Sequence, residues 1–469
     1  MWNFSKYTDK CAIIDEFGTS MSYGELEQEG IELSAAIGKR CLVFSLCSNT
    51  IGSVLGYAAF INHKIVAALL NAQLEKELLF NLIGTYQPEY LWVPNEKREL
   101  FPTYTVCLEK YEYCLLKTDI SEGFPLYEEL GLLLTTSGST GSPKFVRQSY
   151  KNIQANAEAI AEYLLLDDTE RPITTLPMNY TYGLSIINSH FLVGATLLVT
   201  DKSILQKEFW NFFKEQEATS FGGVPYTYEI LDKMRFMRMR LPSLRTMTQA
   251  GGKLSPELHK KFAEWSLQEG KNFIVMYGQC EATARMAYLP SEKSLEKYGS
   301  MGIAIPGGKF HIIDVEGKQI CEPEISGELV YEGPNVTLGY AEQGEDLSKG
   351  DERHGILQTG DMAKFDADGY YYIVGRKKRF LKIYGNRVNL DEIDRMIKAN
   401  FDYIDCASAG IDDHMYIFVT DTSIAEKVKE FVVNKTGLNQ LAFKVVALDE
   451  IPKNDSGKTL YRELEKYYK

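Results

Sequence analysis

The loop sequence Ser-Gly-Ser-Thr-Gly-Ser-Pro-Lys occupies residues 137–144. The apolar run before it, residues 131–136, is typical of a buried strand. After the loop we expect an amphipathic helix from about Ser149 to Leu165, with Ser149 as its N-cap. Glycines let backbone N–H groups approach an anion closely, hydroxyls donate further hydrogen bonds, and the lysine adds positive charge. The stretch therefore predicts a loop that holds nucleotide phosphates; a solvated hairpin turn is the alternative interpretation.

This loop differs from the common P-loop, which ends in Gly-Lys followed by Ser or Thr. Here Pro143 separates the glycine-rich turn from Lys144, and Phe145 stands where the metal-holding hydroxyl would be. Residues 452–459 do end in Gly-Lys-Thr, but a proline replaces the first glycine. Only 11 residues follow Lys458, too few for a βαβ core. The sequence thus favours a nucleotide site in a different fold.

Further motifs follow the loop along the chain. They are Tyr-Gly-Gln-Cys-Glu-Ala-Thr at 277–283, Gly-Glu-Leu at 327–329, Gly-Pro-Asn at 333–335, Gly-Tyr at 339–340, Thr-Gly-Asp at 359–361, Gly-Arg at 375–376, Lys-Ile-Tyr-Gly-Asn-Arg at 382–387 and Pro-Lys-Asn-Asp-Ser-Gly-Lys at 452–458. In content and order they resemble the adenylate-forming superfamily, which includes acyl-CoA synthetases, firefly luciferase and the adenylation domains of nonribosomal peptide synthetases. The resemblance runs from Ser137 to Lys458, about two thirds of the chain.

The resemblance implies an α/β fold in two domains. Residues 1–376 are expected to form a large N-terminal adenylation core of two βα-layered subdomains plus a small β-barrel-like unit. Residues 377–469 are expected to form a small, mobile α+β domain that carries Lys458. The charged stretch at 375–379 lies between two ordered patterns, which favours a boundary there.

The residue patterns along the chain agree with such a fold. Strands that alternate with helices predict βα units with a parallel sheet, and short strands between glycine-rich turns from 307 to 374 predict an antiparallel or barrel-like unit. Helices are expected across Arg235–Arg240, after the Ser255-Pro256 pair, and after a capping box at 389–392, whereas 51–70 predicts a helix, a turn and a strand. The candidate strands are 41–44, 90–93, 172–176, 196–200, 220–222, 244–248, 273–276, 309–315, 327–331 and 370–374.

Composition excludes several classes of function. The chain has 469 residues, 45% of them hydrophobic and 25% charged, with a net charge of −13, which argues against a nucleic-acid-binding surface. Eight cysteines without a Cys-x-x-Cys pair predict neither a zinc site nor a disulfide framework. The N-terminus shows no secretory signal, and Asn62-His63-Lys64 interrupts the most apolar stretch, so we expect no membrane span and a cytoplasmic location.

Activation of an acid by ATP joins two anions and expels pyrophosphate, so its barrier falls when donors, cations and Mg²⁺ are preorganised. By resemblance, Glu281 is the Mg²⁺ ligand, Tyr277 stacks on the adenine, and Asp361 accepts hydrogen bonds from both ribose hydroxyls. Arg376 is expected to contact the ribose or the phosphates. The other residues expected to bind ATP are Thr136, Ser137, Gly138, Ser139, Thr140, Gly141, Lys144, Gly251, Gly252 and Gly278.

The resemblance also implies a conformational switch. Lys458 is expected to reach the α-phosphate and the attacking carboxylate, and then to be withdrawn when the C-terminal domain rotates. The hinge falls on Lys378, where the family commonly has Asp, and a charged, hydrated residue suits a hinge. Gly385 is expected to line the tunnel for the incoming thiol, where a side chain would obstruct it.

Two positions depart from the family pattern. Cys280 stands where the family usually has Thr, and a thiol is a weaker donor toward the α-phosphate. Tyr180 stands where acyl-CoA synthetases often have His, and peptide-synthetase domains for α-amino acids commonly have Asp there. We expect Tyr180 or Tyr182, with Gly183, to line the acid site; the alternative is that both tyrosines only pack in the core.

Together these features predict an AMP-forming acid–thiol ligase that uses ATP, Mg²⁺ and CoA. One alternative is a ligase that loads the phosphopantetheine arm of a separate carrier protein, and a remote one is a non-catalytic nucleotide-binding relative. The presence of Lys458, Glu281 and Asp361 argues against the last reading. The sequence leaves the identity of the acid open.

Overall fold

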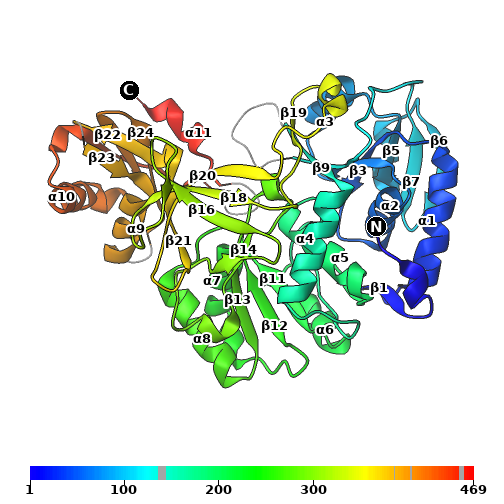
Figure 1. Cartoon of the computed structure of the whole chain (residues 1–469), viewed down its shortest axis with the longest axis horizontal. Coiled ribbons are helices and arrows are strands. Elements are labelled where there is room, and N and C mark those ends of the chain that lie inside the picture. Colours follow the sequence, from blue (N-terminus) through cyan, green and yellow to red (C-terminus); the bar gives the residue numbers. More distant parts are fainter. Residues whose placement is uncertain (136–143, 385, 402–403, 454–458, 469) are drawn as a thin grey trace. The chain divides into compact units, whose positions relative to one another are not determined.

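The computed structural model describes residues 1–135, 144–384, 386–401, 404–453 and 459–468 (Figure 1). At 378, 380, 386 and 387 it describes the backbone alone. The chain divides into two compact units: residues 1–309 with 331–357, and residues 310–330 with 358–469. The domain boundary predicted after residue 376 is a different kind of division, because it marks the start of the segment that is expected to rotate. That boundary stays a prediction.

An eight-stranded sheet forms the N-terminal part of the first unit. Its central strands are parallel and its edge strands antiparallel. Because successive side chains on a strand point to opposite faces, β3 sends Val43 into one hydrophobic core and Phe44 into another. The order is β19 (Gly339–Ala341), β9 (Phe145–Ser149), β8 (Leu130–Thr135), β4 (Val66–Asn71), β3 (Leu42–Cys47), β5 (Tyr90–Pro94), β7 (Tyr113–Lys117) and β6 (Thr105–Lys110).

Helices cover this sheet, as the alternating pattern predicts (Figure 1). They are α1 (Tyr23–Ile37), α2 (Ile51–Asn62) and α3 (Lys76–Tyr86). The α2 helix is buried along nearly its whole length, which explains why its sequence is too apolar for a surface helix. The turn after Asn62 leads directly into β4, so the predicted helix, turn and strand at 51–70 are confirmed.

Two smaller sheets complete the first unit. One has the order β10 (Leu197–Val199), β1 (Cys11–Asp15), β2 (Ser20–Ser22), and the other has β11 (Ser220–Gly223), β12 (Thr246–Gln249), β13 (Asn272–Tyr277), β14 (Ala287–Tyr288), β15 (Ile303–Ala304). Strands β11, β12 and β13 are parallel, and β14 returns antiparallel to β13. The associated helices are α4 (Tyr150–Tyr163), α5 (Thr181–Val193), α6 (Lys207–Glu215), α7 (Pro225–Lys233) and α8 (Pro256–Gln268).

The predicted helix at 149–165 is confirmed as α4. Ser149 accepts from the backbone N–H of Asn152, whose side chain in turn accepts from the backbone of Ser149, which satisfies two N–H groups of the first turn. Ser255 caps α8 in the predicted way, with a proline at the first helical position.

One strand was not expected, and two local expectations were wrong. The unexpected strand is β9, which lies between residue 144 and α4 and pairs antiparallel with β8. The helix expected at 235–240 does not form, because α7 ends at Lys233 and Arg235 takes a left-handed conformation before a short 3-10 turn. Residues 172–176 make only two isolated bridges, in which Pro172 pairs with Ser220 and Ile173 with Leu198.

The second unit holds the small β unit and the C-terminal segment. Its five-stranded sheet runs β17 (Gln319–Ile320), β16 (Lys309–Ile313), β18 (Gly327–Glu332), β20 (Ile356–Phe365), β21 (Tyr371–Arg376), and the unit boundary falls inside β16, β18 and β20. The Asn389 side chain caps α9 by accepting hydrogen bonds from the backbone N–H groups of Asp391 and Glu392. Among the described contacts, this is the half of the predicted capping box that forms. The remaining elements are β22 (Phe380–Ile383), β23 (Asn386–Asn389), α9 (Leu390–Asn400), β24 (Cys406–Ile411), β25 (His414–Val419), α10 (Ala425–Thr436), β26 (Phe443–Ala447) and α11 (Tyr461–Leu464).

Among the described residues, no helix combines the length and the apolar character that crossing a bilayer requires.

Candidate functional site

The predicted phosphate loop is anchored at both ends by one pair of strands. Thr135 is the last residue of β8, and it pairs with Phe145, the first residue of β9. Residues 136–143, which include the predicted ligands Thr136, Ser137, Gly138, Ser139, Thr140 and Gly141, lie outside the described residues. Lys144 is described, and its ammonium nitrogen lies 3.6 Å from the centroid of the Tyr340 ring on β19.

Tyr340 links Lys144 to the predicted metal ligand. Its hydroxyl donates to Oε1 of Glu281 at 2.6 Å. The guanidinium of Arg353 lies 4.7 Å from the same ring and donates to the main-chain oxygen of Glu281 at 3.0 Å. Burial, together with the negative charge of Glu281, raises the pKa of the Tyr340 hydroxyl, which therefore remains a donor. The structure thus brings Glu281 and Lys144 together around one tyrosine that sequence analysis gave no role.

The carboxylate of Glu281 suits a magnesium ion. Its second oxygen, Oε2, has no hydrogen-bond partner among the described residues, so it can face a ligand. Mg²⁺ prefers oxygen ligands, keeps several waters, and is usually held by one or two carboxylates plus phosphate oxygens of the substrate. In line with this, the described residues contain no group of three or more acidic, histidine or cysteine side chains that could hold a metal by themselves.

A strained turn follows Glu281. Thr283 has φ +60° and Ala284 has φ +143°, both in the region that residues other than glycine rarely adopt. Asn335 holds this turn, because its side-chain nitrogen donates to the carbonyls of Ala282 at 2.8 Å and Arg285 at 3.1 Å. Backbone strain that several bonds maintain is typical of functional sites.

The predicted purine-side residues also form turns. Tyr277 ends β13, and the side chain of Gln279 donates to its hydroxyl at 3.1 Å. A Cβ on Gly278 would collide with the carbonyl oxygen of Ala284, so only glycine fits before the strained turn. Gly251 has φ +82°, and Gly252 accepts at 3.0 Å from the side chain of Gln249. These contacts explain the residue types but do not test the adenine contact.

The two candidate acid-site tyrosines differ in their surroundings. Tyr180 precedes α5, and burial, with a smaller contribution from Cys280, raises its pKa to about 12. A Cβ on Gly251 would lie 2.7 Å from the Tyr180 hydroxyl, so Tyr180, Gly251 and Cys280 are neighbours. Tyr182 is buried, and its hydroxyl shares a hydrogen bond of 2.8 Å with Thr248.

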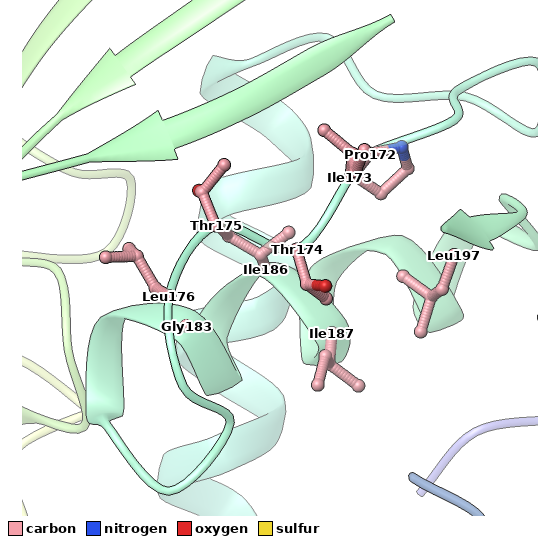
Figure 2. A pocket seen from close by; sticks show the side chains of 9 residues that line it. All are labelled: Pro172, Ile173, Thr174, Thr175, Leu176, Gly183, Ile186, Ile187 and Leu197. Carbon is pink, nitrogen blue, oxygen red and sulfur yellow. The ribbon is translucent and has the colours of Figure 1, made fainter. Parts of the chain in front are cut away.

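Gly183 has a packing role. A Cβ there would collide with the carbonyl oxygen of Pro177, which lies against the first turn of α5. Gly183 also borders a small cavity of about 10 Å³, shown in Figure 2. A space of that size is at the lower limit for a single water, so this cavity is a packing gap rather than an acid pocket. Its lining residues are Pro172, Ile173, Thr174, Thr175, Leu176, Gly183, Ile186, Ile187 and Leu197.

The second unit pairs the two residues predicted to meet the ribose. Asp361 on β20 stands directly opposite Arg376 on β21. The Asp361 side chain is 6% exposed and the Arg376 side chain 66% exposed, and Nε of Arg376 lies 3.3 Å from Oδ1 of Asp361. The carboxylate is thus held in place at one edge, while the guanidinium extends toward solvent. The two residues lie together, and their contact with a nucleotide stays a prediction.

The hinge and the segment of the predicted catalytic lysine are also in the second unit. Gly385 and Lys458 lie outside the described residues, and of Lys378 only the backbone is described. Lys453 and Thr459, the described residues on either side of positions 454–458, pair in an isolated antiparallel bridge. Directly after the predicted hinge, Arg379 pairs with Asp391 and Asp394 at 2.8 Å and lies 3.9 Å from the Tyr461 ring, two residues past that bridge. Arg379 therefore contacts the segment that follows the bridge.

One buried cationic side chain, that of Arg285, was not predicted from the sequence. Arg285 lies immediately after the strained turn and is 2% exposed. Its Nε donates to the Ser185 hydroxyl at 3.1 Å, and its Nη1 donates to the Tyr163 hydroxyl at 3.1 Å and to the Met276 sulfur at 3.4 Å. The signal in the sequence was a lone charge in the otherwise apolar run Ala-Arg-Met-Ala-Tyr-Leu at 284–289.

Comparison with known proteins decides the family. Residues 2–341, which are 340 of the 469 residues, match the family model described as AMP-binding enzyme. The chain belongs to this family. The fold of this AMP-binding enzyme is that of solved family structures. It superposes with a TM-score of 0.79 and 22% identity on o-succinylbenzoate CoA synthetase from Bacillus subtilis in complex with its acyl-adenylate, over 99% of this chain and 98% of that one.

Three other matches show the range of similar proteins. ATP-bound MatB from Rhodopseudomonas palustris has a TM-score of 0.78 at 21% identity, over 99% of this chain and 98% of that one. The peroxisomal OPC-8:0-CoA ligase 1 of Arabidopsis thaliana is 29% identical over 72% of this AMP-binding enzyme but only 64% of the relative's own length. The 2-succinylbenzoate–CoA ligase of Bacillus mycoides (strain KBAB4) is 27% identical over 86% of this chain and 83% of its own.

Proposed function

We propose that this AMP-binding enzyme activates a carboxylic acid with ATP and transfers the acyl group to the thiol of CoA. A carboxylate oxygen attacks the α-phosphorus and pyrophosphate leaves. The thiol sulfur, having lost its proton, then attacks the acyl carbon and AMP leaves. The observation that carries the proposal is the Glu281 carboxylate beside Lys144 and Arg353 around Tyr340. Relatives named as CoA ligases support it.

Each protein group has a distinct task in this reaction. Bound Mg²⁺, held by Glu281, would neutralise charge on the phosphate oxygens. Lys144 and the 136–141 loop would hold the β- and γ-phosphates, Asp361 and Arg376 the ribose, and Tyr277 the adenine. Lys458 would supply positive charge to the α-phosphate in the first step only. Rotation about Lys378 would then withdraw Lys458 and bring Gly385 to the path of the thiol.

We place the enzyme in the cytoplasm and give it CoA as acceptor. The structure describes all eight cysteines, and none forms a disulfide, as suits a reducing compartment. The relatives named as CoA ligases favour CoA over the phosphopantetheine arm of a separate carrier protein. A carrier acceptor is the second candidate, and it shares the first half-reaction.

Product analysis tests the proposal. Incubation with ATP, Mg²⁺, CoA and a panel of acids is expected to give AMP, pyrophosphate and an acyl-CoA in equal amounts. Glu281→Gln is expected to lower that rate at least about 10²-fold, because it removes the charged ligand of the metal. Formation of ADP would contradict the proposal. Formation of AMP without a thioester, together with acylation of added carrier proteins, would favour the second candidate.

A further inference from the structure

Arg285 differs from the other deeply buried arginines of the chain. Arg147 is fully buried and pairs with Glu352 and several main-chain carbonyls. Arg379 is 11% exposed and pairs with Asp391 and Asp394. Arg285 is 2% exposed, and no carboxylate of any described residue pairs with it. Since a buried charge is strongly disfavoured unless it is compensated, Arg285 lacks the anion that the other two arginines have.

The neighbours of Arg285 leave part of its guanidinium available. Its side-chain hydrogen bonds go to two neutral hydroxyls and a thioether sulfur, which is a weak acceptor. Nη2 has no partner among the described residues. The planar guanidinium matches a carboxylate in a two-bond geometry, so an incoming carboxylate is the chemical partner that this site fits.

The position of Arg285 is next to the candidate acid site. Its guanidinium lies 5.2 Å from the ring of Tyr182, and its Nε contacts Ser185 one turn further along α5. Along the chain, Arg285 is five residues after Cys280 and four after Glu281. Tyr163 and Tyr182 belong to an otherwise largely apolar core cluster, in which hydroxyl groups of Tyr163, Ser185, Tyr182 and Thr248 supply polar contacts.

The backbone of Arg285 is held rigidly. Its carbonyl accepts from Asn335 at 3.1 Å and from Asn156 at 2.9 Å. The strained residues Thr283 and Ala284 direct the chain back toward β13, where the backbone N–H of Met286 donates to Tyr277 at 2.8 Å. The fold thus presents a fixed, uncompensated positive charge beside the segment that carries Cys280 and Glu281.

We infer that the acid activated by this enzyme is a dicarboxylic acid whose second carboxylate binds Arg285. The inference rests on the proposed function and names its substrate class. One carboxylate reacts with ATP, while the other stays ionised and compensates the guanidinium. A monocarboxylic acid of equal length would leave the buried charge unpaired, so it would be rejected, as sites built for a polar group reject analogues that lack it.

Matched pairs of acids test the inference in the wild-type enzyme. The pairs are succinate with butyrate, glutarate with pentanoate, and isophthalate with benzoate, each assayed by exchange of pyrophosphate into ATP and by the thermal midpoint without ATP. In at least one pair, the diacid is expected to have a kcat/KM about 10²-fold higher and to raise the midpoint more than its monoacid. Equal or better exchange with the monoacids in every pair would overturn the inference.

Variants locate the second carboxylate. Arg285→Met is expected to reduce the preference for the diacid to a few-fold, and Arg285→Lys to keep part of it because the charge remains. Arg171→Met, which removes an arginine that contacts Gln216, is the matched control and is expected to keep the preference. An unchanged preference in Arg285→Met would overturn the inference.

The two readouts separate this inference from the proposed function. Exchange with monoacids alone would retain acid activation and refute the role of Arg285. Midpoint shifts with diacids that disappear in Arg285→Met, without exchange for any acid, would retain the anion site and refute acid activation. If Arg285→Met fails to fold, the comparison of matched acids on the wild-type enzyme decides, and the absence of any larger shift or rate with diacids refutes the inference.

Discussion

At the scale of single residues, Tyr340 holds the carboxylate that is predicted to bind the metal. Its ring lies close to the cations of Lys144 and Arg353, and its hydroxyl fixes one oxygen of Glu281. Cations near an aromatic face are attracted to it, and a hydrogen bond to a charged acceptor is stronger than one to a neutral acceptor. The tyrosine therefore orients Glu281 through both its ring and its hydroxyl.

Replacing Tyr340 with Phe tests this orientation. The ring stays beside the two cations while the hydrogen bond to Glu281 is lost, so kcat/KM for ATP is expected to fall about 10-fold to 10²-fold, with a higher Mg²⁺ requirement. The measurement is initial rate against Mg²⁺ concentration. Tyr86→Phe, which removes a buried hydroxyl bond to Ala341 at 2.9 Å, is the control and is expected to keep the wild-type Mg²⁺ requirement. An unaltered Mg²⁺ curve in Tyr340→Phe would refute the role.

Asp361 is tested by pairing a variant with an altered nucleotide. If its carboxylate accepts from the ribose hydroxyls, the wild-type enzyme prefers ATP over 2′,3′-dideoxy-ATP, and Asp361→Asn loses most of that preference, by about 10-fold or more. The measurement is kcat/KM for both nucleotides in both proteins. Since Arg376 pairs with Asp361, the thermal unfolding of the variant is measured as well, to show that it remains folded. An equal preference in both proteins would show that Asp361 is structural.

At the scale of elements, strands with a simple apolar run could be predicted and the others could not. The runs that became β3, β5 and β8 are apolar along their length, and their positions follow from sequence. The strand β9 has the sequence Phe-Val-Arg-Gln-Ser, and its charged arginine interrupts the apolar pattern by which a buried strand is recognised. Arg147 is nonetheless buried, because carbonyls of Leu338, Tyr340 and Gly350 and the carboxylate of Glu352 surround it. Partners about 200 residues away are invisible to a local pattern.

The same limit applies to the candidate site. Residues within contiguous motifs, such as Glu281 and Asp361, were found from sequence, whereas Arg353 and Arg285 act through contacts that only the fold creates. The turn that presents Arg285 needs Asn335, which was seen in a motif but without a task. Sequence motifs therefore give candidate ligands, whereas the contacts that position them become visible only in the fold.

The buried charge in β9 leads to a stability prediction. Glu352→Gln removes the carboxylate partner of Arg147, and the lost pairing is expected to lower the free energy of unfolding by about 1–2 kcal/mol, since Glu352 is itself half exposed. Urea unfolding is the measurement. Glu296→Gln, which removes an exposed carboxylate near Lys293, is expected to change it by less than about 0.5 kcal/mol. Equal effects of both variants would contradict this role of Glu352.

At the scale of the whole molecule, the first unit is expected to lose stability in acid. Burial lowers the pKa of His190 and His259 to about 4 each, from 6.5. Between about pH 4 and pH 6.5, these histidines are therefore neutral in the folded protein but bind a proton in the unfolded chain. The stabilising contribution is complete above pH 6.5 and is lost as the pH falls toward 4.

A variant of His259 isolates one of these contributions. His259→Asn removes a titrating group far from the reacting residues, so unfolding of the first unit should depend less on pH between 7 and 5, by about 2 kcal/mol. The variant is less stable at pH 7, because the bonds from Gly299 and to Ser294 are altered. The test is therefore the difference between the two pH values rather than either one. The same pH dependence as in the wild-type protein would contradict it.

The proposed rotation of the segment after residue 376 has a kinetic test. Lys458→Ala is expected to slow adenylate formation about 10²-fold to 10⁴-fold while sparing thioester formation from a pre-formed acyl-adenylate. Gly385→Leu is expected to do the reverse. A similar loss in both half-reactions for Lys458→Ala would refute the switch, and an equal loss of adenylate formation in Gly385→Leu would make Gly385 a folding residue.

Exchange of labelled pyrophosphate into ATP, with Mg²⁺ and a carboxylic acid but without any thiol, tests the central claim most directly. Exchange requires a reversible acyl-adenylate, because only that intermediate returns pyrophosphate to ATP. Exchange is expected to depend on the acid and to be lost in Glu281→Gln. Absence of exchange across acids of every class, from an enzyme shown to bind ATP, would contradict it.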